Sequence, residues 1–509
     1  MPRSVARNYV KKSLVDQICA HRIDEAGTEQ YLIKWKNDAL SQAVVSWHHL
    51  DDLIPIADSL QTYINNFILN IKSGYGTGSL TLAPADQVSS LKRKSPHDES
   101  PASRASSLDT STTNSSAISI SSSKLEVWNG VLLKKAGDIY PHSLASGVER
   151  IDATTVPTPE MLSAAKAYLA DGVKQGRKFI RRQFLGQLER IPGPKVTFVN
   201  VINKETPSLK FTYIQDYVLG HGVSREDADA VKMGCEKCRP DMGGNRGCEY
   251  TAKCDCLEFA VPDLARCKDD EQKEQFAAWE RGEAGSDGLP KRFPYRIDPN
   301  SKKFVLDTFY LESRNPIYEC NELCRCGSGC KNRLVQKGRT VPLEIFKTLK
   351  RGFGLRCPID LKRGQYIDRY LGELITDTEA SAREASGIFD KASYLFTLDK
   401  YVQDDGEPDS LRRSDCYVAD GEKMGGLTRF INHSCDPNCR LFTVSYNRFD
   451  RRIYDLAFFA LDNIPAGTEL TFDYNDVEER ELQANDSGEG GSFVKCYCGS
   501  KNCRGKLWV

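Results

Sequence analysis

Apolar positions follow two different periods along the chain and divide it into segments. Within residues 8–68, the runs EQYLIKW and AVVSWHHL are rich in β-branched and aromatic residues, whereas IADSLQTYINNFILNI carries apolar residues at helical spacing. Residues 159–191 show the helical period again, and KVTFVNVINK and LKFTYIQDYVL then have the character of strands. A small folded unit, followed by a helix and extended segments, is therefore expected in the first part of the chain.

From Leu343 onward the pattern changes to short strands separated by glycine turns. The segments are LEIFKTLKRGFGLRC, QYIDRYLGELI, SYLFTLD, RIYDLAFFAL and ELTFDY. This pattern predicts a mostly β, α+β fold without long helices in the last part of the chain. Before it, the charged insert KDDEQKEQFAAWERGEAGSDG predicts an exposed helix and loop.

Residues 74–125 follow neither period. They are poor in aromatic residues and rich in Ser, Thr and charge, which predicts a disordered linker. The basic trio Lys92–Lys94, beside Ser95-Pro96, fits a nuclear import signal and fits a solvated charge cluster equally well.

The overall composition narrows the class of protein. A chain of 509 residues exceeds a single core, so two or three domains are expected. The net charge of zero gives no global attraction to nucleic acid. Neither a long apolar run nor an apolar N-terminal stretch is present, so no membrane span and no secretion signal are expected.

The 18 cysteines are concentrated in two places. Ten lie between Cys235 and Cys330, and three lie in the last fourteen residues. Without a secretion signal, such tight clusters indicate metal sites rather than disulfides.

The first cluster fits a shared zinc site. Without Cys267, which lies beside the charged insert, it supplies nine thiolates: Cys235, Cys238, Cys248, Cys254, Cys256, Cys320, Cys324, Cys326 and Cys330. Because tetrahedral zinc takes four ligands, three ions need twelve positions, which nine thiolates fill if three of them bridge two ions. The alternative is two separate four-cysteine sites with one thiol left over. Either site would be structural, since no position stays open for water.

The tail motif C-x-C-x4-C offers only three ligands, Cys496, Cys498 and Cys503. A fourth zinc ligand must come from elsewhere. Cys435 in RFINHSCDPNC is the first candidate, and Cys439 is its rival for the same position. Such a site would join the tail to the body of the last domain.

The segments RGFGLR, YLGELI, SYLFTLD, RFINHSCDPNC and IPAGTELTFDY occur in an order that resembles the SET domain of protein lysine methyltransferases. The nine-cysteine cluster resembles the pre-SET module, and the tail motif resembles the post-SET module. The combination resembles the suppressor-of-variegation class of histone H3 lysine-9 methyltransferases, in particular the fungal ones. The resemblance divides the chain into an N-terminal flank (126–199), a pre-SET module (200–340), a SET domain (341–475), a loop (476–491) and a post-SET module (492–509).

This resemblance implies S-adenosylmethionine as the methyl donor. It assigns to the cofactor pocket the residues Gly352, Phe353, Gly354, Tyr394, Arg429, Phe430, Asn432 and His433, with Trp508 over the cofactor once zinc orders the tail. The usual Gly-Asn upstream of Asn432-His433 is Gly425-Gly426 here, which removes one expected contact.

The same resemblance implies three catalytic residues. Tyr474 and Tyr394 would hydrogen-bond the substrate amine and place it, and Tyr474 would assist the departure of its proton. Phe472 would face the lysine channel. Because a phenylalanine has no hydroxyl to hold a water beside the amine, transfer of two or three methyl groups is expected.

Residues 8–68 resemble a chromodomain through Tyr9, YLIKWK and SWHHLDDL. This resemblance makes Tyr9 and Trp35 two walls of an aromatic cage for methylated lysine. The third cage position is Asp38, which is not aromatic. A repurposed interaction module is therefore the alternative.

The expected function is methyl transfer from S-adenosylmethionine to lysine 9 of histone H3, in heterochromatin formation and gene silencing in the nucleus. The expected partners are the histone H3 tail in the nucleosome and, through the chromodomain, methylated histone. The acidic segment LDKYVQDDGEPD fits a groove for the histone tail and fits a solvated loop equally well. The alternative function is a catalytically inactive zinc-binding scaffold. Sequence-specific DNA binding is not expected, because the cysteine cluster lacks both finger-spaced histidines and a basic recognition helix.

Overall fold

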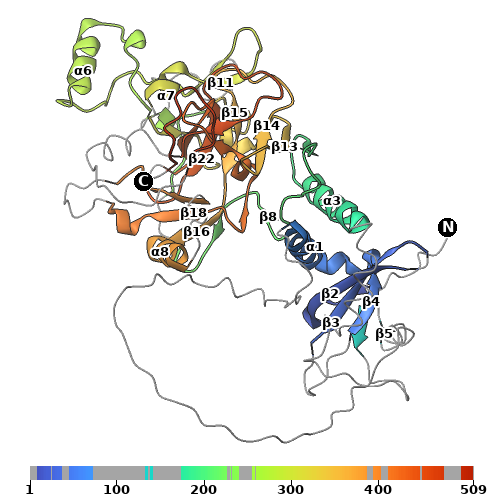
Figure 1. The fold of residues 1–509 in the computed structure, drawn as a ribbon. Helices are drawn as coiled ribbons and strands as arrows, with labels where there is room; N and C mark the ends of the chain where they lie inside the picture. Colours follow the sequence, from blue (N-terminus) through green and yellow to red (C-terminus); the bar gives the residue numbers. More distant parts are fainter. Residues whose placement is uncertain are drawn as a thin grey trace, which may run out of the picture. The chain divides into compact units, whose positions relative to one another are not determined.

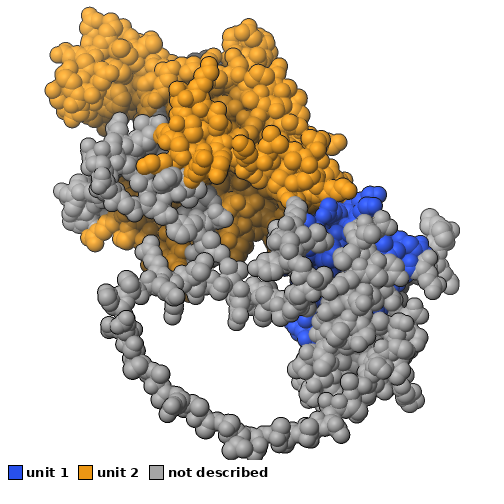
Figure 2. Space-filling view, viewed as in Figure 1, with its two compact units in different colours: residues 1–180 blue, residues 181–509 orange. Residues whose placement is uncertain are grey.

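The computed structural model describes residues 9–24, 26–36, 45–72, 132–135, 138–141, 173–225, 230, 232–239, 255–257, 260–313, 315–386, 394–402, 411–447, 450–474 and 495–507. The chain forms two compact units, residues 1–180 and 181–509, which Figure 2 shows in blue and orange. Within the described ranges no helix is both long and apolar enough to cross a membrane.

The first unit contains a three-stranded antiparallel sheet, β2-β3-β4 (Val15–Ile23, Glu29–Trp35 and Val45–His49). A 3-10 helix, Leu50–Ile56, leads from it into α1 (Ala57–Lys72). Strand β3 and the α1 residues Leu60 and Ile64 bury their apolar side chains and form the core of this unit. Strand β1 (Tyr9–Val10) pairs in parallel with β6 (Asp138–Pro141), and β6 pairs with β5 (Leu132–Lys135).

Helix α3 (Lys174–Glu189) starts on an acidic side chain of the first unit. The Glu29 carboxylate accepts the backbone N–H groups of Gln175 and Gly176, each at 2.7 Å, and the hydroxyl of Tyr31 at 2.8 Å. A carboxylate at this position satisfies the open N–H groups of the first turn and complements the helix dipole. The helix predicted for residues 159–191 therefore starts, in the described part of the chain, at Lys174; the preceding residues lie outside the described ranges.

Two four-stranded sheets form the body of the second unit (Figure 1). The first has the order β12-β21-β22-β15, with the bounds Ile317–Tyr318, Cys439–Ser445, Asp455–Ala460 and Tyr366–Tyr370. The second has the order β17-β18-β16-β9, with the bounds Leu395–Thr397, Tyr417–Asp420, Glu373–Thr376 and Val218–Leu219. Helix α8 (Asp377–Ser386) packs on β16 and β18.

Smaller sheets complete the second unit. A three-stranded sheet has the order β14-β13-β7, with the bounds Phe353–Arg356, Leu343–Lys347 and Val196–Val199. The two-stranded pairs are β10 with β11 (Tyr295–Ile297, Phe304–Leu306), β19 with β8 (Met424–Gly425, Thr212–Tyr213) and β20 with β23 (Asn432–His433, Thr471–Phe472). Two further α-helices lie in the described part of this unit, α6 (Asp270–Glu280), within the charged insert, and α7 (Thr308–Ser313).

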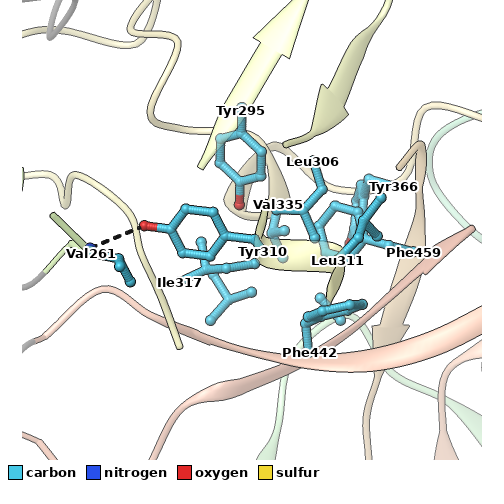
Figure 3. Packing of buried hydrophobic residues seen from close by; sticks show 12 residues of the cluster. Val261, Tyr295, Leu306, Tyr310, Leu311, Ile317, Val335, Tyr366, Phe442 and Phe459 are labelled. Atoms are coloured by element: carbon cyan, nitrogen blue, oxygen red, sulfur yellow. Dashed lines mark hydrogen bonds between the residues drawn. The ribbon is translucent and has the colours of Figure 1, made fainter. Parts of the chain in front are cut away.

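The core that joins the cysteine-rich region to the strands lies around α7 (Figure 3). Tyr310 is buried, and its hydroxyl accepts the backbone N–H of Val261 at 3.4 Å, the dashed line in Figure 3. Phe442 and Phe459 pack edge to face with ring centroids 5.6 Å apart. Strand β22 is buried along its whole length. Aromatic residues of the cysteine-rich region, such as Tyr310, and of the strands, such as Phe459, therefore share one core.

The β-rich α+β class expected from the sequence is confirmed by this arrangement. Two strand predictions were too long. KVTFVNVINK ends as a strand at Val199, because the Asn200 side chain accepts the N–H groups of Ile202 and Asn203 and folds the chain into a turn. LKFTYIQDYVL forms only the short strands β8 and β9, which pair with different partners.

Candidate active site and metal centres

Two short strands distant in sequence pair at the centre of the site. In the parallel pairing of β20 with β23, Asn432 lies opposite Thr471 and His433 opposite Phe472. The backbone N–H of Ser434 donates to the carbonyl of Phe472 at 2.9 Å. The pairing therefore brings the Asn432-His433 motif beside Phe472 and close to Tyr474, two residues further on.

The Tyr474 side chain is held between these strands. Its hydroxyl donates to the carbonyl of Ile431 at 3.0 Å, and its ring lies 4.7 Å from that of Phe472 and 5.3 Å from that of His433. Burial, with a further contribution from the nearby Tyr394, raises the pKa of Tyr474 well above its usual value. The phenol therefore stays protonated at neutral pH and acts as a fixed hydrogen-bonding group.

Tyr394 is placed by a cationic side chain. The Arg429 guanidinium lies over three aromatic rings, at 4.2 Å from the centroid of Phe211, 4.8 Å from that of Tyr394 and 5.1 Å from that of Phe430. Such cation–π contacts fix ring orientation without a hydrogen bond. The carbonyl of Tyr394 also accepts the hydroxyl of Tyr370 at 2.8 Å. Tyr394 is therefore held both through its ring and through its backbone.

The glycines of the predicted cofactor turn serve two different purposes. Gly352 has a φ of 68°, a conformation that favours glycine. At Gly354 a Cβ atom would lie 2.9 Å from Oε1 of Glu469 and 3.0 Å from the Phe346 ring. Between them, the carbonyl of Phe353 accepts the side-chain amide of Asn432 at 3.2 Å. The structure thus brings the glycine turn and the Asn432-His433 motif together.

Sequence reasoning missed two charged residues of this site, Arg351 and Glu469. The Glu469 carboxylate accepts the Asn432 amide at 2.8 Å and pairs with the Arg351 guanidinium at 2.5 Å. Arg351 also donates to the carbonyl of His433 at 3.0 Å. The sequence does offer one signal for this pair: Glu469 directly precedes the strand-like run LTF. A carboxylate that is buried beside such a run needs a charged or hydrogen-bonding partner.

Four thiols meet where the tail reaches the SET region. The Sγ atoms of Cys435, Cys496, Cys498 and Cys503 all lie within 4.8 Å of one another, and those of Cys435 and Cys496 are 3.9 Å apart. Four sulfurs at about 2.3 Å from a tetrahedral zinc would be about 3.8 Å apart, so this group fits the ion. Cys439 does not belong to the group: it is buried, and burial raises the pKa of its thiol well above the usual value.

The described thiols of the first cluster form three groups. These are Cys235, Cys238 and Cys256; Cys256, Cys320 and Cys324; and Cys320, Cys326 and Cys330. The Sγ distances of 3.8 Å between Cys256 and Cys324 and 3.9 Å between Cys320 and Cys330 again fit tetrahedral zinc. Cys256 and Cys320 each belong to two groups, as bridging thiolates must.

Several other predicted site residues lie outside the described ranges, and Cys267 lies outside the thiol groups. Cys248, Cys254, Trp508, Asp38 and the acidic residues 404–409 are outside the described ranges. Cys267 belongs to none of the groups formed by described residues, and its thiol lies 3.7 Å from the carbonyl of Asp263.

The proposed cage residue Trp35 is a core residue in this arrangement. Its side chain is 1% exposed, and its indole N–H donates to the hydroxyl of Ser46 at 2.9 Å. Tyr9, in β1, is half-buried. Because a cage wall must present its ring face to the ligand, Trp35 would have to turn outward to serve as one.

Comparisons with known proteins show the family to which this chain belongs. The SET domain family model matches residues 352–475, and the Pre-SET motif model matches residues 189–333. The histone-lysine N-methyltransferase, H3 lysine-9 specific dim-5, of Neurospora crassa is 40% identical over 316 residues, which cover 61% of this chain and 88% of that protein. The H3 lysine-9 specific KMT1 of Fusarium mangiferae is 40% identical over 62% of this chain and 88% of that protein.

A solved structure was also found, that of the Neurospora SET domain protein DIM-5. It covers 60% of this chain and 100% of its own at 36% identity, with a TM-score of 0.46. The sequence matches define a protein methyltransferase class with SET and pre-SET regions. More particularly, this chain belongs to the family of SET-domain histone-lysine N-methyltransferases that contains the H3 lysine-9 specific fungal enzymes.

Proposed function

We propose that this protein transfers methyl groups from S-adenosylmethionine to lysine 9 of histone H3. The observation that carries the proposal is the pairing of β20 with β23, which joins Asn432 and His433 to Phe472 and Tyr474. The lysine specificity is supported by relatives whose names state it, two of them 40% identical to this chain.

The bound cofactor would supply a methyl group activated by a sulfonium charge. Around it, Asn432, Glu469 and Arg351 tie the glycine turn to the Asn432-His433 strand. The backbone of Gly352 is open to close approach, because no atom of the described residues lies within 4 Å of a Cβ built there, whereas Gly354 packs against Glu469 and Phe346. These residues would bind and orient the methionine end of the cofactor.

Tyr474 would place the substrate amine. Since its hydroxyl proton is donated to Ile431, its oxygen lone pairs are left to accept an N–H of the neutral lysine amine. That hydrogen bond would aim the nitrogen lone pair toward the methyl group. Because its pKa is raised, the phenol stays protonated at neutral pH, so Tyr474 would act on the amine through this hydrogen bond.

Phe472 would set the number of methyl groups added. It is 5% exposed and packs against Phe396 and Phe458, with centroids 5.9 and 5.0 Å away. This apolar wall offers no hydroxyl to anchor a water beside the amine, so a methylated amine can rotate and react again. Addition of two or three methyl groups is proposed.

Zinc would hold the two cysteine groups together. Three ions are proposed for the pre-SET cluster, with Cys256 and Cys320 as two of the three bridging thiolates and Cys248 and Cys254 supplying the remaining positions. One further ion is proposed for Cys435 and the tail thiols. All positions of these ions would be filled by sulfur, which gives them a structural role.

The biological setting follows from the substrate. A histone methyltransferase acts on chromatin, so a nuclear location and a role in heterochromatin formation and gene silencing are proposed. We also propose that residues 8–68 bind methylated histone. This binding would require the buried Trp35 ring to turn outward and face the ligand.

A radiolabelled methyl-transfer assay tests the function. The full chain, incubated with S-adenosylmethionine and a histone H3 tail peptide, is expected to label the peptide. A peptide with alanine at histone position 9 should remain unlabelled, and Tyr474→Phe should lower the rate on the order of a hundredfold. Absence of transfer by the zinc-loaded wild-type protein would instead favour an inactive chromatin scaffold.

A further inference from the structure

An arginine of the tail forms an ion pair with the residue that precedes the catalytic tyrosine. Arg504 directly follows Cys503, and its guanidinium forms two hydrogen bonds to the Asp473 carboxylate, Nη2 to Oδ1 at 2.7 Å and Nη1 to Oδ2 at 3.0 Å. Asp473 lies between Phe472 and Tyr474 in the sequence. A bidentate pair of this kind fixes orientation as well as distance.

The same arginine is anchored at the four-thiol group. Its backbone N–H donates to Sγ of Cys435 at 3.4 Å, and the next residue, Gly505, donates to Sγ of Cys503 at 3.4 Å. Thiolates that bind a metal commonly accept backbone N–H groups in this way. The position of Arg504 therefore depends on the order of this group.

His433 provides a second connection between the thiols and Tyr474. Its Nδ1 lies 3.1 Å from the backbone nitrogen of Tyr474. Because a backbone N–H can only donate, Nδ1 is the acceptor, and in the neutral ring Nε2 carries the proton. Nε2 lies 3.2 Å from Sγ of Cys435 and, in a longer contact, 3.5 Å from Nη2 of Arg504. One imidazole thus contacts a thiol of the group and the backbone of the catalytic tyrosine.

We propose that Arg504 and Asp473, together with His433, transmit the occupancy of the tail metal centre to Tyr474. The metal would then control the alignment of the catalytic tyrosine in addition to any closure of the tail over the cofactor. Arg504 and Asp473 are positioning residues in this scheme, since neither needs to touch the substrate. The proposal rests on the proposed methyltransferase function and adds a path by which zinc acts on the rate of transfer.

Kinetics of Arg504→Gln, Asp473→Asn and the double variant test the pair. Misplacing a reacting group by about 1 Å costs on the order of a hundredfold in rate. A loss in kcat of roughly ten- to a hundredfold is therefore expected for each single variant, with the KM for S-adenosylmethionine changed by less than about twofold. Because the two residues act together, the double variant should be no slower than the slower single one. Arg504→Lys should not restore the rate, since an ammonium cannot form the paired contact.

The matched control is Arg281→Gln. Arg281 also makes two hydrogen bonds to one carboxylate, that of Glu283, at 3.0 and 2.8 Å, but the pair lies exposed beyond the end of α6. Its removal should leave kcat and KM unchanged. Losses that simply add in the double variant, or a rise in KM at constant kcat, would overturn the proposal.

Hydrogen exchange of the Tyr474 amide gives a readout that needs no turnover. In the zinc-loaded wild type this amide, bonded to His433, should exchange slowly, and chelation of zinc should accelerate it. Arg504→Gln should accelerate it while elemental analysis finds the zinc content unchanged. An exchange rate indifferent to zinc and to Arg504→Gln would refute the connection. This holds even if no activity toward histone H3 is found, so failure of the proposed function is distinguished from failure of this inference.

Discussion

The side-chain amide of Asn432 donates to the carboxylate of Glu469 at 2.8 Å, a contact that joins two segments 37 positions apart in the sequence. The same amide reaches the carbonyl of Phe353 at 3.2 Å. Asn432 thus connects the glycine turn to the strand that enters the catalytic segment. The proposed cofactor pocket would therefore depend on this connection as well as on the glycines.

Replacing Glu469 by glutamine should therefore weaken cofactor binding. The change keeps the shape but removes the charge that pairs with Arg351, leaving that guanidinium without its carboxylate. Loss of one such charge-assisted bond predicts a rise in the Kd for S-adenosylmethionine of about tenfold or more, measured by titration calorimetry. Glu312→Gln, which removes an exposed partner of Arg363, should bind the cofactor as the wild type does. Equal affinities for the two variants would contradict this role of Glu469.

Elemental analysis should find about four zinc ions per chain, because two thiols are shared among the described groups and the tail supplies one more site. Cys267→Ala should retain the full amount, since that thiol lies outside the groups of described cysteines. A content near two in the wild type would exclude shared thiolates.

Cys435→Ala should remove one zinc ion and abolish most of the activity, while the pre-SET ions remain. The physical reason is that three thiols alone leave the tail ion with an open position. Cys439→Ala, at a buried thiol outside the group, serves as the control and should keep all the zinc. The opposite outcome, with zinc lost from Cys439→Ala and kept by Cys435→Ala, would assign the fourth ligand to Cys439.

Phe472→Tyr should shift the product toward monomethyl-lysine. The new hydroxyl would lie in an apolar wall formed with Phe396 and Phe458, where it would hold a water close to the amine. Displacing that water leaves a buried polar group unpaired, which opposes a second transfer. Mass spectrometry of a histone H3 peptide after exhaustive reaction distinguishes the products. A wild-type enzyme that stops at one methyl group would refute the role given to Phe472.

Much of the second unit was predictable because its strands are short runs rich in β-branched and aromatic residues. Strands β13, β15 and β22 fall inside such runs, and glycine turns separate several of them. The two-residue strands were beyond such reasoning, because β8, β9 and β20 are too short to show any period. Their positions are fixed by distant partners and by side chains such as Asn438, which accepts the N–H of Thr471 at 2.9 Å.

The predictable part of the site is its cysteines, because ligand number restricts them strongly. The requirement for four ligands reduces the candidates for the fourth position to Cys435 and its rival Cys439, and it is Cys435 that lies among the three tail thiols. No comparable rule predicts the charged residues Glu469, Arg351 and Asp473, because their roles depend on which groups lie within reach after folding. Trp35 shows the reverse case: a motif position suggested an exposed ring, and packing against Ser46 and His48 buries it.

The four-thiol group can assemble only late in the synthesis of this chain, after all four of its cysteines have been translated. Cys435 emerges from the ribosome with the body of the SET region, whereas its three companions begin 61 positions later, at Cys496. A nascent or prematurely terminated chain that ends after Tyr474 has the paired strands but lacks the thiols and Arg504. Only a chain that extends through Cys503 can assemble this group, so a product shortened before Cys496 would lack the contacts by which the group is proposed to act on Tyr474.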